Sequence, residues 1–223
     1  MNSTEILVII PAMNESATIG AIVQSIHHHL HATVIVVDDA SQDNTYQVAK
    51  NAGAIVFQHA FRLGAWGAIR TGLYYAQQEG YDIAITMDAD GQHPITAISN
   101  LIEPIISKEA DVTIGACTER GSNARKLIWK LFRYLTGIEY QDLTSGFRAY
   151  NQKAISALIN RDTSLFDYQD IGILICLRMN GLKTIEVPVS MQQRQSGHSR
   201  VFYSWLAVAR YMLFTFILIL SKR

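Results

Sequence analysis

Short β-branched runs alternate with amphipathic helical segments through the first half of the chain. Residues 6–10 form one such run, which ends at Pro11, and residues 34–37 form a second, which ends at Asp38. Between them, residues 17–30 carry apolar side chains at helical spacing. A strand, a helix and a strand within about thirty residues make a βαβ unit, which requires a parallel sheet.

The same alternation continues as far as residue 115. It predicts helices at 45–52, 65–78 and 95–107, and strands at 55–57, 83–87 and 112–115. Continuous apolar runs are typical of strands that are covered on both faces. We therefore expect an α/β fold, a mostly parallel sheet flanked by helices, with ligands bound beyond the carboxyl ends of the strands.

The second half of the chain is less regular. It predicts a basic helix at 123–135, a strand at 146–150, a helix at 169–179, a strand at 184–189 and a polar, flexible segment at 192–199. With 223 residues and 49% hydrophobic content, the chain can bury one sizeable core. We expect one domain over residues 1–200, followed by a C-terminal apolar helix over residues 201–223.

Charge and cysteine content narrow the function classes. The formal net charge is +0 at pH 7, so the chain has no overall field that would attract nucleic acid. Cys117 and Cys176 are its two cysteines, and they lie far apart without CxxC spacing. This pattern favours a reduced, cytoplasmic protein over one held together by disulfides.

Polar and acidic clusters follow three of the predicted strands. They are Pro11-Ala12-Met13-Asn14-Glu15, Asp38-Asp39-Ala40-Ser41 and Asp88-Ala89-Asp90. Because parallel strands end at one edge of a sheet, we expect the clusters to converge on one ligand. Glu15 and either Asp38 or Asp39 suit hydrogen bonds from a base or ribose. The DxD triplet suits a hard divalent cation that holds a diphosphate.

A plainer alternative stays open for the same residues. Asn14, Ser41 and Asp43 are all suited to cap the helices that follow them. The DxD triplet is equally compatible with a solvated turn or with the N-cap of the helix at 95–107. This alternative explains one polar residue at each place better than it explains paired acids.

Five motifs occur in the order PAMNE, DDASQDNT, DADGQHP, TSGFRAY and RQSGHSR. Together they resemble the family-two inverting glycosyltransferases of the GT-A fold, and the dolichyl- or polyprenyl-phosphate sugar synthases are the most similar branch. The resemblance covers about residues 6–200 and implies a nucleotide-sugar donor and a divalent metal, Mg²⁺ or Mn²⁺. It implies donor-binding roles for Pro11, Ala12, Asn14, Glu15, Asp38, Asp39, Asp88, Ala89, Gln92, Arg194 and Arg200. It implies metal-binding roles for Asp88, Asp90 and Gln92.

The part of the site that binds a phosphate acceptor needs positively charged side chains. A lipid phosphate is largely ionised at neutral pH, because the second pKa of a phosphate monoester lies near ~6, so it needs no general base. It does need cations, and the planar guanidinium of arginine matches phosphate oxygens in pairs. Arginines of the resembled family that bind the acceptor match Arg120 and Arg125. The alternative for Arg125 is a solvated basic helix face.

The segment from Arg194 to Arg200 resembles a loop of the family that closes over the donor and excludes water. Gly197 would allow this closure. Arg200 stands where the family more often has lysine, which keeps the charge but alters the hydrogen-bond geometry.

Asp170 leaves the acceptor class open. It begins a predicted helix and suits the positive helix end, but family members that glycosylate hydroxyl groups use an acid in this region as general base. The candidate catalytic residues are therefore Asp90, Arg120, Arg125 and Asp170. The alternatives to a lipid-phosphate acceptor are a hydroxyl acceptor on a glycan, lipid or small molecule, and a non-catalytic module that binds nucleotide sugars.

Two further clusters have structural explanations. Arg148 suits an ion pair with Asp142 or Asp170 inside the fold. Four histidines late in the first predicted helix include His27 and His31 on one face, where a solvated helix end is the simpler explanation than a metal site.

The C-terminal segment predicts membrane contact. Residues 211–221 are apolar and uncharged, but they are shorter than the ~20 residues that span a bilayer. Extending the segment to residue 201 would place Arg210 near the middle, which is costly. An interfacial helix, with Arg210, Lys222 and Arg223 near anionic head groups, fits better. We expect a peripheral protein on the cytoplasmic face, with a small membrane protein as an open possibility for a partner and a helix packed on protein as the alternative.

Overall fold

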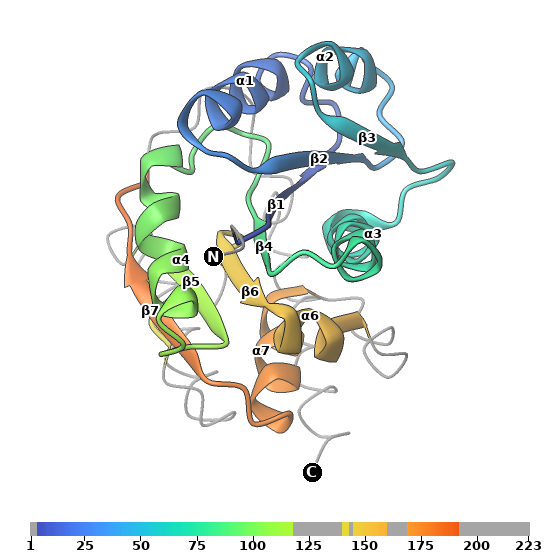
Figure 1. The fold of residues 1–223 in the computed structure, drawn as a ribbon. Helices are drawn as coiled ribbons and strands as arrows, with labels where there is room; N and C mark the ends of the chain where they lie inside the picture. The colour runs from blue at the N-terminus through green and yellow to red at the C-terminus, as the bar shows by residue number, and fades with distance from the viewer. Residues whose placement is uncertain (1–3, 118–139, 143–144, 160–168, 192–223) are drawn as a thin grey trace.

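The computed structural model describes residues 4–117, 140–142, 145–159 and 169–191, with residues 169–171 described by their backbone only. Within these residues the chain forms a seven-stranded sheet in the order β3-β2-β1-β4-β6-β5-β7, with helices on both faces (Figure 1). The strands are β1 (Ile6–Ala12), β2 (Thr33–Asp38), β3 (Ile55–Gln58), β4 (Ile83–Thr86), β5 (Val112–Ala116), β6 (Arg148–Asn151) and β7 (Thr184–Pro188). The predicted α/β fold with a mostly parallel sheet is confirmed.

Strand direction is uniform except for β6. The pairs β1–β2, β1–β4, β2–β3 and β5–β7 are parallel, whereas β6 runs antiparallel to both β4 and β5. Ala12 pairs with Asp38 where β1 and β2 end, and Ile9 pairs with Thr86 where β4 ends. We call this side of the sheet the carboxyl edge. Because β6 is antiparallel, its first residue Arg148 pairs with Thr86 and begins at the same edge.

The helices cover the two faces of the sheet in separate groups. One face packs against α1 (Ile19–His29), α2 (Thr45–Asn51) and α4 (Ile98–Ile106), and α4 follows a short 3-10 turn, η1 (Ile95–Ala97). The other packs against α3 (Gly64–Glu79), α6 (Gln152–Ile159) and α7 (Gln169–Met179). Alternate β1 residues serve the two cores: Leu7 and Ile9 belong to one, and Val8 and Ile10 to the other. This arrangement explains why the strands are apolar throughout and not alternately polar.

Two features of the fold differ from the sequence prediction. The structure has a helix at α6, where no element was predicted between residues 150 and 169. The helix is short and follows β6 without a turn residue between them, so no break in composition marks it. The predicted helix at 95–107 begins as a 3-10 turn. The predicted helices at 123–135 and 201–223 lie outside the described residues.

None of the helices in the described ranges combines the length and the apolar character needed to cross a membrane.

Candidate active site

Hydrogen bonds join the three loops that leave β1, β2 and β4 at the carboxyl edge. The backbone N–H of Asp39 donates to the carbonyl oxygen of Ala12 at 2.8 Å, which joins the second loop to the first. The hydroxyl of Thr18 donates to the carbonyl oxygen of Ala89 at 2.6 Å, which joins the DxD segment to the loop after β1. The structure therefore brings all three acidic clusters to one edge of the sheet.

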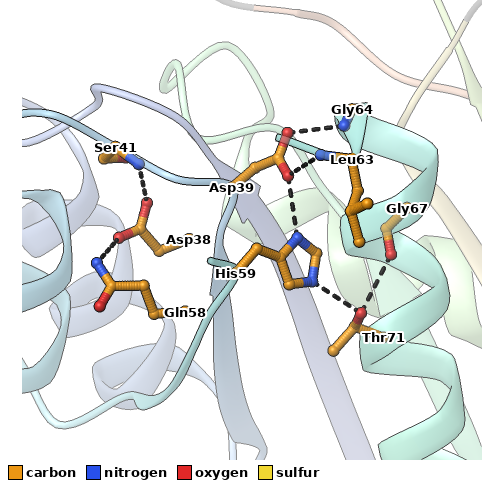
Figure 2. A network of polar contacts seen from close by, with 9 residues as sticks. All are labelled: Asp38, Asp39, Ser41, Gln58, His59, Leu63, Gly64, Gly67 and Thr71. Atoms are coloured by element: carbon orange, nitrogen blue, oxygen red, sulfur yellow. Dashed lines mark hydrogen bonds and ion pairs between the residues drawn. The ribbon is translucent and has the colours of Figure 1, made fainter. Parts of the chain in front are cut away.

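Asp38 is fully buried at the end of β2. One of its carboxylate oxygens accepts the backbone N–H of Ser41 at 3.0 Å, and the other accepts the amide of Gln58 at 3.0 Å (Figure 2). Its relative exposure is 0%, so its side chain offers no surface to a ligand. Asp38 thus fixes the turn after β2 to the end of β3.

Asp39 is held by three hydrogen bonds from the segment between β3 and α3. Its Oδ1 accepts the backbone N–H of Leu63 at 2.7 Å and lies 2.9 Å from Nδ1 of His59, and its Oδ2 accepts the N–H of Gly64 at 2.8 Å (Figure 2). His59 continues the network to the hydroxyl of Thr71 at 2.9 Å. A carboxylate has about four lone-pair sites. Asp39 therefore has about one left for a ligand.

The loop after β1 is bonded to the loop after β2 by polar groups on both sides. The N–H of Asn14 donates to the hydroxyl of Ser41 at 2.9 Å, and the side-chain oxygen of Asn14 accepts the N–H of Gln42 at 2.7 Å. Asn14 has a left-handed φ of 53°, a conformation that asparagine tolerates better than most residues. The N–H of Glu15 donates to the hydroxyl of Thr45 at 2.8 Å. The first two clusters consequently form one bonded unit.

Asp43 lies in the loop before α2 and accepts hydrogen bonds from the first residue of α2 and from the loop after β1. Its carboxylate accepts the N–H of Thr45 at 3.0 Å and the N–H of Ser16 at 3.2 Å. Burial acts to raise the pKa of Asp43, but hydrogen bonds from Thr45 and Ser16 outweigh it and lower the pKa from 3.8 to about 2. Asp43 lies next to the N-cap of α2, Asn44, and bonds the first helical N–H. The predicted capping by Asn14 and Ser41 is wrong, because Thr18 and Asn44 occupy the N-cap positions of α1 and α2, and Asn14 and Ser41 join the two loops instead.

The two acids of the DxD segment have different surroundings. The side chain of Asp88 is 51% exposed, and its Oδ2 lies 3.0 Å from Nε2 of His93. Asp90 is mostly buried, and its Oδ1 accepts the N–H of Gln92 at 3.0 Å across a turn at Gly91, whose φ is 76°. The Asp88 carboxylate therefore reaches solvent at the carboxyl edge, whereas Asp90 lies at the base of the turn.

The described residues contain no group of three or more His, Cys, Asp or Glu side chains placed to hold a metal on their own. Two carboxylates and the amide oxygen of Gln92 are nevertheless a suitable donor set for a hard divalent cation whose remaining ligands come from phosphate oxygens and water. Asp88, Asp90 and Gln92 fit a metal of that kind.

The start of β6 completes the edge beside Asp88. The hydroxyl of Ser145 donates to the carbonyl oxygen of Gly115 at 2.6 Å, and the hydroxyl of Thr86 donates to the carbonyl oxygen of Gly146 at 2.8 Å. Arg148 is buried at 1% exposure. The described part of the TSGFRAY motif therefore lies against the DADGQHP motif. Arg148 lies within the fold, and its ion pair with Asp142 or Asp170 stays a prediction.

Several predicted site residues lie beyond what the structure describes. Arg120, Arg125, Arg194 and Arg200 are outside the described residues, and Asp170 is placed in the first turn of α7 by its backbone only. The histidines at the end of α1 are solvent-exposed, and Nδ1 of His29 lies 2.8 Å from the carbonyl oxygen of Ser25. The exposed helix end predicted for this cluster is what the structure shows.

His59 and His93 were not among the predicted site residues. His93 lies within the DADGQHP motif, so its sequence position was a usable signal. His59 follows β3, which ends at the same edge as β2, so the predicted topology could have placed it there.

The model of Glycosyl transferase family 2 matches residues 7–164. The UDP-N-acetylglucosamine–dolichyl-phosphate N-acetylglucosaminyltransferase of Methanococcus voltae is 31% identical over 211 residues, covering 82% of this chain and 84% of that protein. The polyprenol monophosphomannose synthase of Mycolicibacterium smegmatis is 29% identical over 216 residues, covering 87% of this chain and 80% of that protein.

A solved structure shows the same fold. The glucosyl-3-phosphoglycerate synthase from Mycobacterium tuberculosis, in complex with Mn²⁺, UDP and phosphoglyceric acid, matches with a TM-score of 0.70. The two sequences are 20% identical, and the match covers 88% of this chain and 72% of that chain. At this level of identity the likeness concerns the fold alone.

Proposed function

This chain belongs to glycosyl transferase family 2, and we propose that it transfers a sugar, with inversion, from a UDP- or GDP-sugar to a polyprenyl phosphate. The family resemblance predicted from the five motifs is confirmed, and so are the GT-A fold and the glycosyltransferase class. The observation that carries the donor half of the proposal is the junction of the loops after β1, β2 and β4 at one carboxyl edge. Ligands of open α/β sheets bind at such an edge.

We propose that the nucleoside lies over the loops after β1 and β2. Pro11, Ala12, Asn14 and Glu15 would contact it, and Glu15 is partly exposed at this edge. Asp38 would act other than by direct contact, because it is fully buried and both of its oxygens already accept donors, and Asp39 has about one acceptor position left. Their proposed role is to hold the two loops in the shape that receives the base and ribose.

We propose that the diphosphate lies beside Asp88, Ala89, Asp90 and Gln92, with Asp88, Asp90 and Gln92 as ligands of Mg²⁺ or Mn²⁺. A bound divalent cation would stabilise the negative charge of the departing nucleoside diphosphate. This placement is supported by the half-exposed side chain of Asp88 and by the turn at Gly91, which brings the backbone N–H of Gln92 to the Asp90 carboxylate. Asp90 would serve the reaction by fixing the leaving group in line with the anomeric carbon.

The acceptor proposed is a polyprenyl phosphate, because two relatives that match most of this chain carry dolichyl phosphate or polyprenol monophosphomannose in their names. Such a phosphate is its own nucleophile at neutral pH, so the protein must supply positive charge and position. We assign this role to Arg120 and Arg125, and we propose that Arg194 and Arg200 close over the donor.

The rival acceptor is a hydroxyl group, which needs a general base. Asp170, in the first turn of α7, is the candidate base. Replacing it separates the two acceptors. Asp170→Asn should abolish transfer to a hydroxyl but have only a modest effect on transfer to a phosphate that is already ionised.

We further propose that the chain works as a peripheral protein on the cytoplasmic face of a membrane. Residues 201–223 would form the interfacial helix, either alone or with a small membrane protein. Deleting residues 201–223 should release the protein from anionic vesicles while leaving donor binding largely intact. Loss of folding on deletion would instead support a helix packed against the domain.

The proposed function is tested with a panel of UDP- and GDP-sugars, with Mg²⁺ or Mn²⁺, in the presence and absence of a short polyprenyl phosphate. We expect one donor to bind in a metal-dependent way and its sugar to appear on the lipid phosphate. Donor binding without any transfer would favour a non-catalytic binding module. If no donor binds with either metal, the proposal fails.

A further inference from the structure

Asp88 lies between two groups that come from different parts of the fold. On one side, Nε2 of His93 lies 3.0 Å from its Oδ2. On the other, a Cβ added to Gly146 would lie 2.9 Å from its Oδ1. The antiparallel pairing of β4 and β6 brings Gly146 to this place, because the start of β6 lies beside the end of β4.

His93 is a buried side chain that presents one polar atom to Asp88. Its side chain is 1% exposed, and its ring lies on that of Phe147 with the centroids 4.9 Å apart. The other ring nitrogen, Nδ1, is buried and has no hydrogen-bond partner. Since a carboxylate only accepts hydrogen bonds, Nε2 is the donor of this pair.

Stability alone does not account for a histidine at this position. The hydrogen bond to the Asp88 carboxylate stabilises the fold, but leaving Nδ1 buried without a partner costs free energy of similar size. A phenylalanine ring would make the same contact with Phe147 without burying Nδ1. The donor at Nε2 must therefore serve Asp88.

Gly146 limits the opposite side of the same carboxylate. Its carbonyl oxygen accepts the hydroxyl of Thr86 at 2.8 Å, so its backbone is fixed to β4. Its φ lies outside the left-handed region, so alanine would be compatible with the backbone. What alanine would disturb is the position of the Asp88 carboxylate, because the close atom is the end of that side chain.

We propose that His93 and Gly146 are positioning residues that together set the orientation of the Asp88 carboxylate for a divalent cation. His93 holds Oδ2 through a hydrogen bond, and the bare backbone of Gly146 leaves room for Oδ1. The inference rests on the proposed function, since it takes Asp88 to be a metal ligand. Groups that orient metal ligands commonly have a large effect on metal affinity, because small displacements of a ligand weaken metal binding.

The test uses the full-length chain and two variants that disturb Asp88 from opposite sides. His93→Phe removes the donor but keeps the ring, and Gly146→Ala adds one methyl group. His93→Gln restores a side-chain N–H donor in place of Nε2. His27→Phe on the exposed end of α1 and Gly20→Ala within α1, where the added methyl would meet Val48, are the matched controls.

Binding is measured by titrating Mn²⁺ and following the EPR signal of the free ion, in the presence of UDP and, separately, of GDP. We expect His93→Phe and Gly146→Ala each to weaken Mn²⁺ binding about 10- to 100-fold, the usual effect of losing an orienting group. His93→Gln should recover most of the affinity, and the two controls should match the wild type. The midpoint temperature of thermal unfolding of His93→Phe should be no lower than that of the wild type.

The outcomes separate this inference from the proposed function. If the wild type binds Mn²⁺ with a nucleotide and both variants bind it equally well, the positioning role is overturned and the proposed function stands. If the wild type binds no Mn²⁺ with either nucleotide, the metal site and the positioning role both fail. If His93→Phe does not fold, Gly146→Ala decides the question alone.

Discussion

Two pairs of acids follow parallel strands at the same edge of the sheet, yet Asp88, the first acid of the β4 pair, has surroundings that differ from those of the β2 pair. Asp38 and Asp39 follow β2, are buried, and accept hydrogen bonds from Ser41, Gln58, Leu63, Gly64 and His59. Asp88 follows β4 with half of its side chain exposed. One sequence signal, an acid pair after a strand, therefore fixes the architecture at β2 and leaves one carboxylate, that of Asp88, half exposed at β4.

The cause lies in the elements next to each pair. The first N–H groups of a helix lack partners within the helix. Asp39 lies beside the start of α3 and accepts two of the N–H groups there, those of Leu63 and Gly64. After β4, by contrast, the chain turns at Gly91 before the short turn η1. Asp88 precedes this turn, and half of its side chain remains at the surface.

The largest expected effect is a loss of sugar transfer when either acid of the β4 pair, Asp88 or Asp90, is substituted. Asp88→Asn and Asp90→Asn remove charge from the proposed metal site while preserving size. If a metal stabilises the leaving group by several kcal/mol, transfer should fall about 10²- to 10⁴-fold. The measurement is kcat/KM for sugar transfer with saturating Mg²⁺ or Mn²⁺.

Stability is the control for this prediction. Asp88→Asn should alter the free energy of unfolding by less than about 1 kcal/mol, because the position is half exposed and the amide oxygen can still accept the hydrogen bond from His93. If Asp88→Asn keeps the wild-type kcat/KM, Asp88 does not belong to the proposed metal site, and its functional contrast with the β2 pair is lost.

The next largest effect is on stability, from the β2 pair. Asp39→Ala leaves the N–H groups of Leu63 and Gly64 and the ring of His59 without their acceptor. Hydrogen bonds to charged groups contribute about 1.5–3 kcal/mol each, so a net loss of about 3 kcal/mol is expected once water replaces part of them. Urea unfolding measures it. A loss of donor affinity without a loss of stability would instead make Asp39 a direct ligand contact.

His59 offers a finer probe of the same network. His59→Phe keeps a ring but removes the links to Asp39 and to the hydroxyl of Thr71. The expected loss is about 1 kcal/mol of unfolding free energy, since Leu63 and Gly64 still bind Asp39. Thr71→Val, which removes only the far end of the network, should cost less. Equal losses for the two variants would mean that the contact of His59 with Asp39 contributes nothing.

The sequence predicts the shared edge but not the difference between the two pairs. Continuous apolar runs in β1, β2 and β4 require a covered, parallel sheet, and parallel strands must end together. Whether a carboxylate accepts hydrogen bonds within the fold depends on residues far along the chain: Leu63 and Gly64, which donate to Asp39, lie 24 and 25 positions after it. Local composition carries no information about such a contact.

The antiparallel strand β6 shows the same limit. Its residues Arg148, Ala149 and Tyr150 are buried, as they would be in a parallel strand in the interior of the sheet. Burial thus specifies that the segment is a strand but not its direction. Only the direction places Gly146 beside Asp88, so the contact of the two motifs could not be predicted from either motif alone.

The smallest expected effect concerns pH and tests whether the loop after β1 belongs with the β2 side. Asp43 bonds both loops, and its pKa is lowered from 3.8 to about 2 by the hydrogen bonds that outweigh its burial. Because the folded pKa lies below the unfolded one, the unfolded chain binds more protons between these values, and stability rises with pH there. The contribution is complete above about pH 4 and is lost as pH falls through about 2.

Asp111 has a lowered pKa as well, so acid sensitivity of the wild type alone is not diagnostic. The difference in unfolding free energy between the wild type and Asp43→Asn should therefore shrink as pH falls from about 4 towards 2. A difference that stays constant over this interval would show that the Asp43 carboxylate does not join the two loops in solution, and the loop after β1 would then be held by Asn14, Ser41 and Thr45 instead.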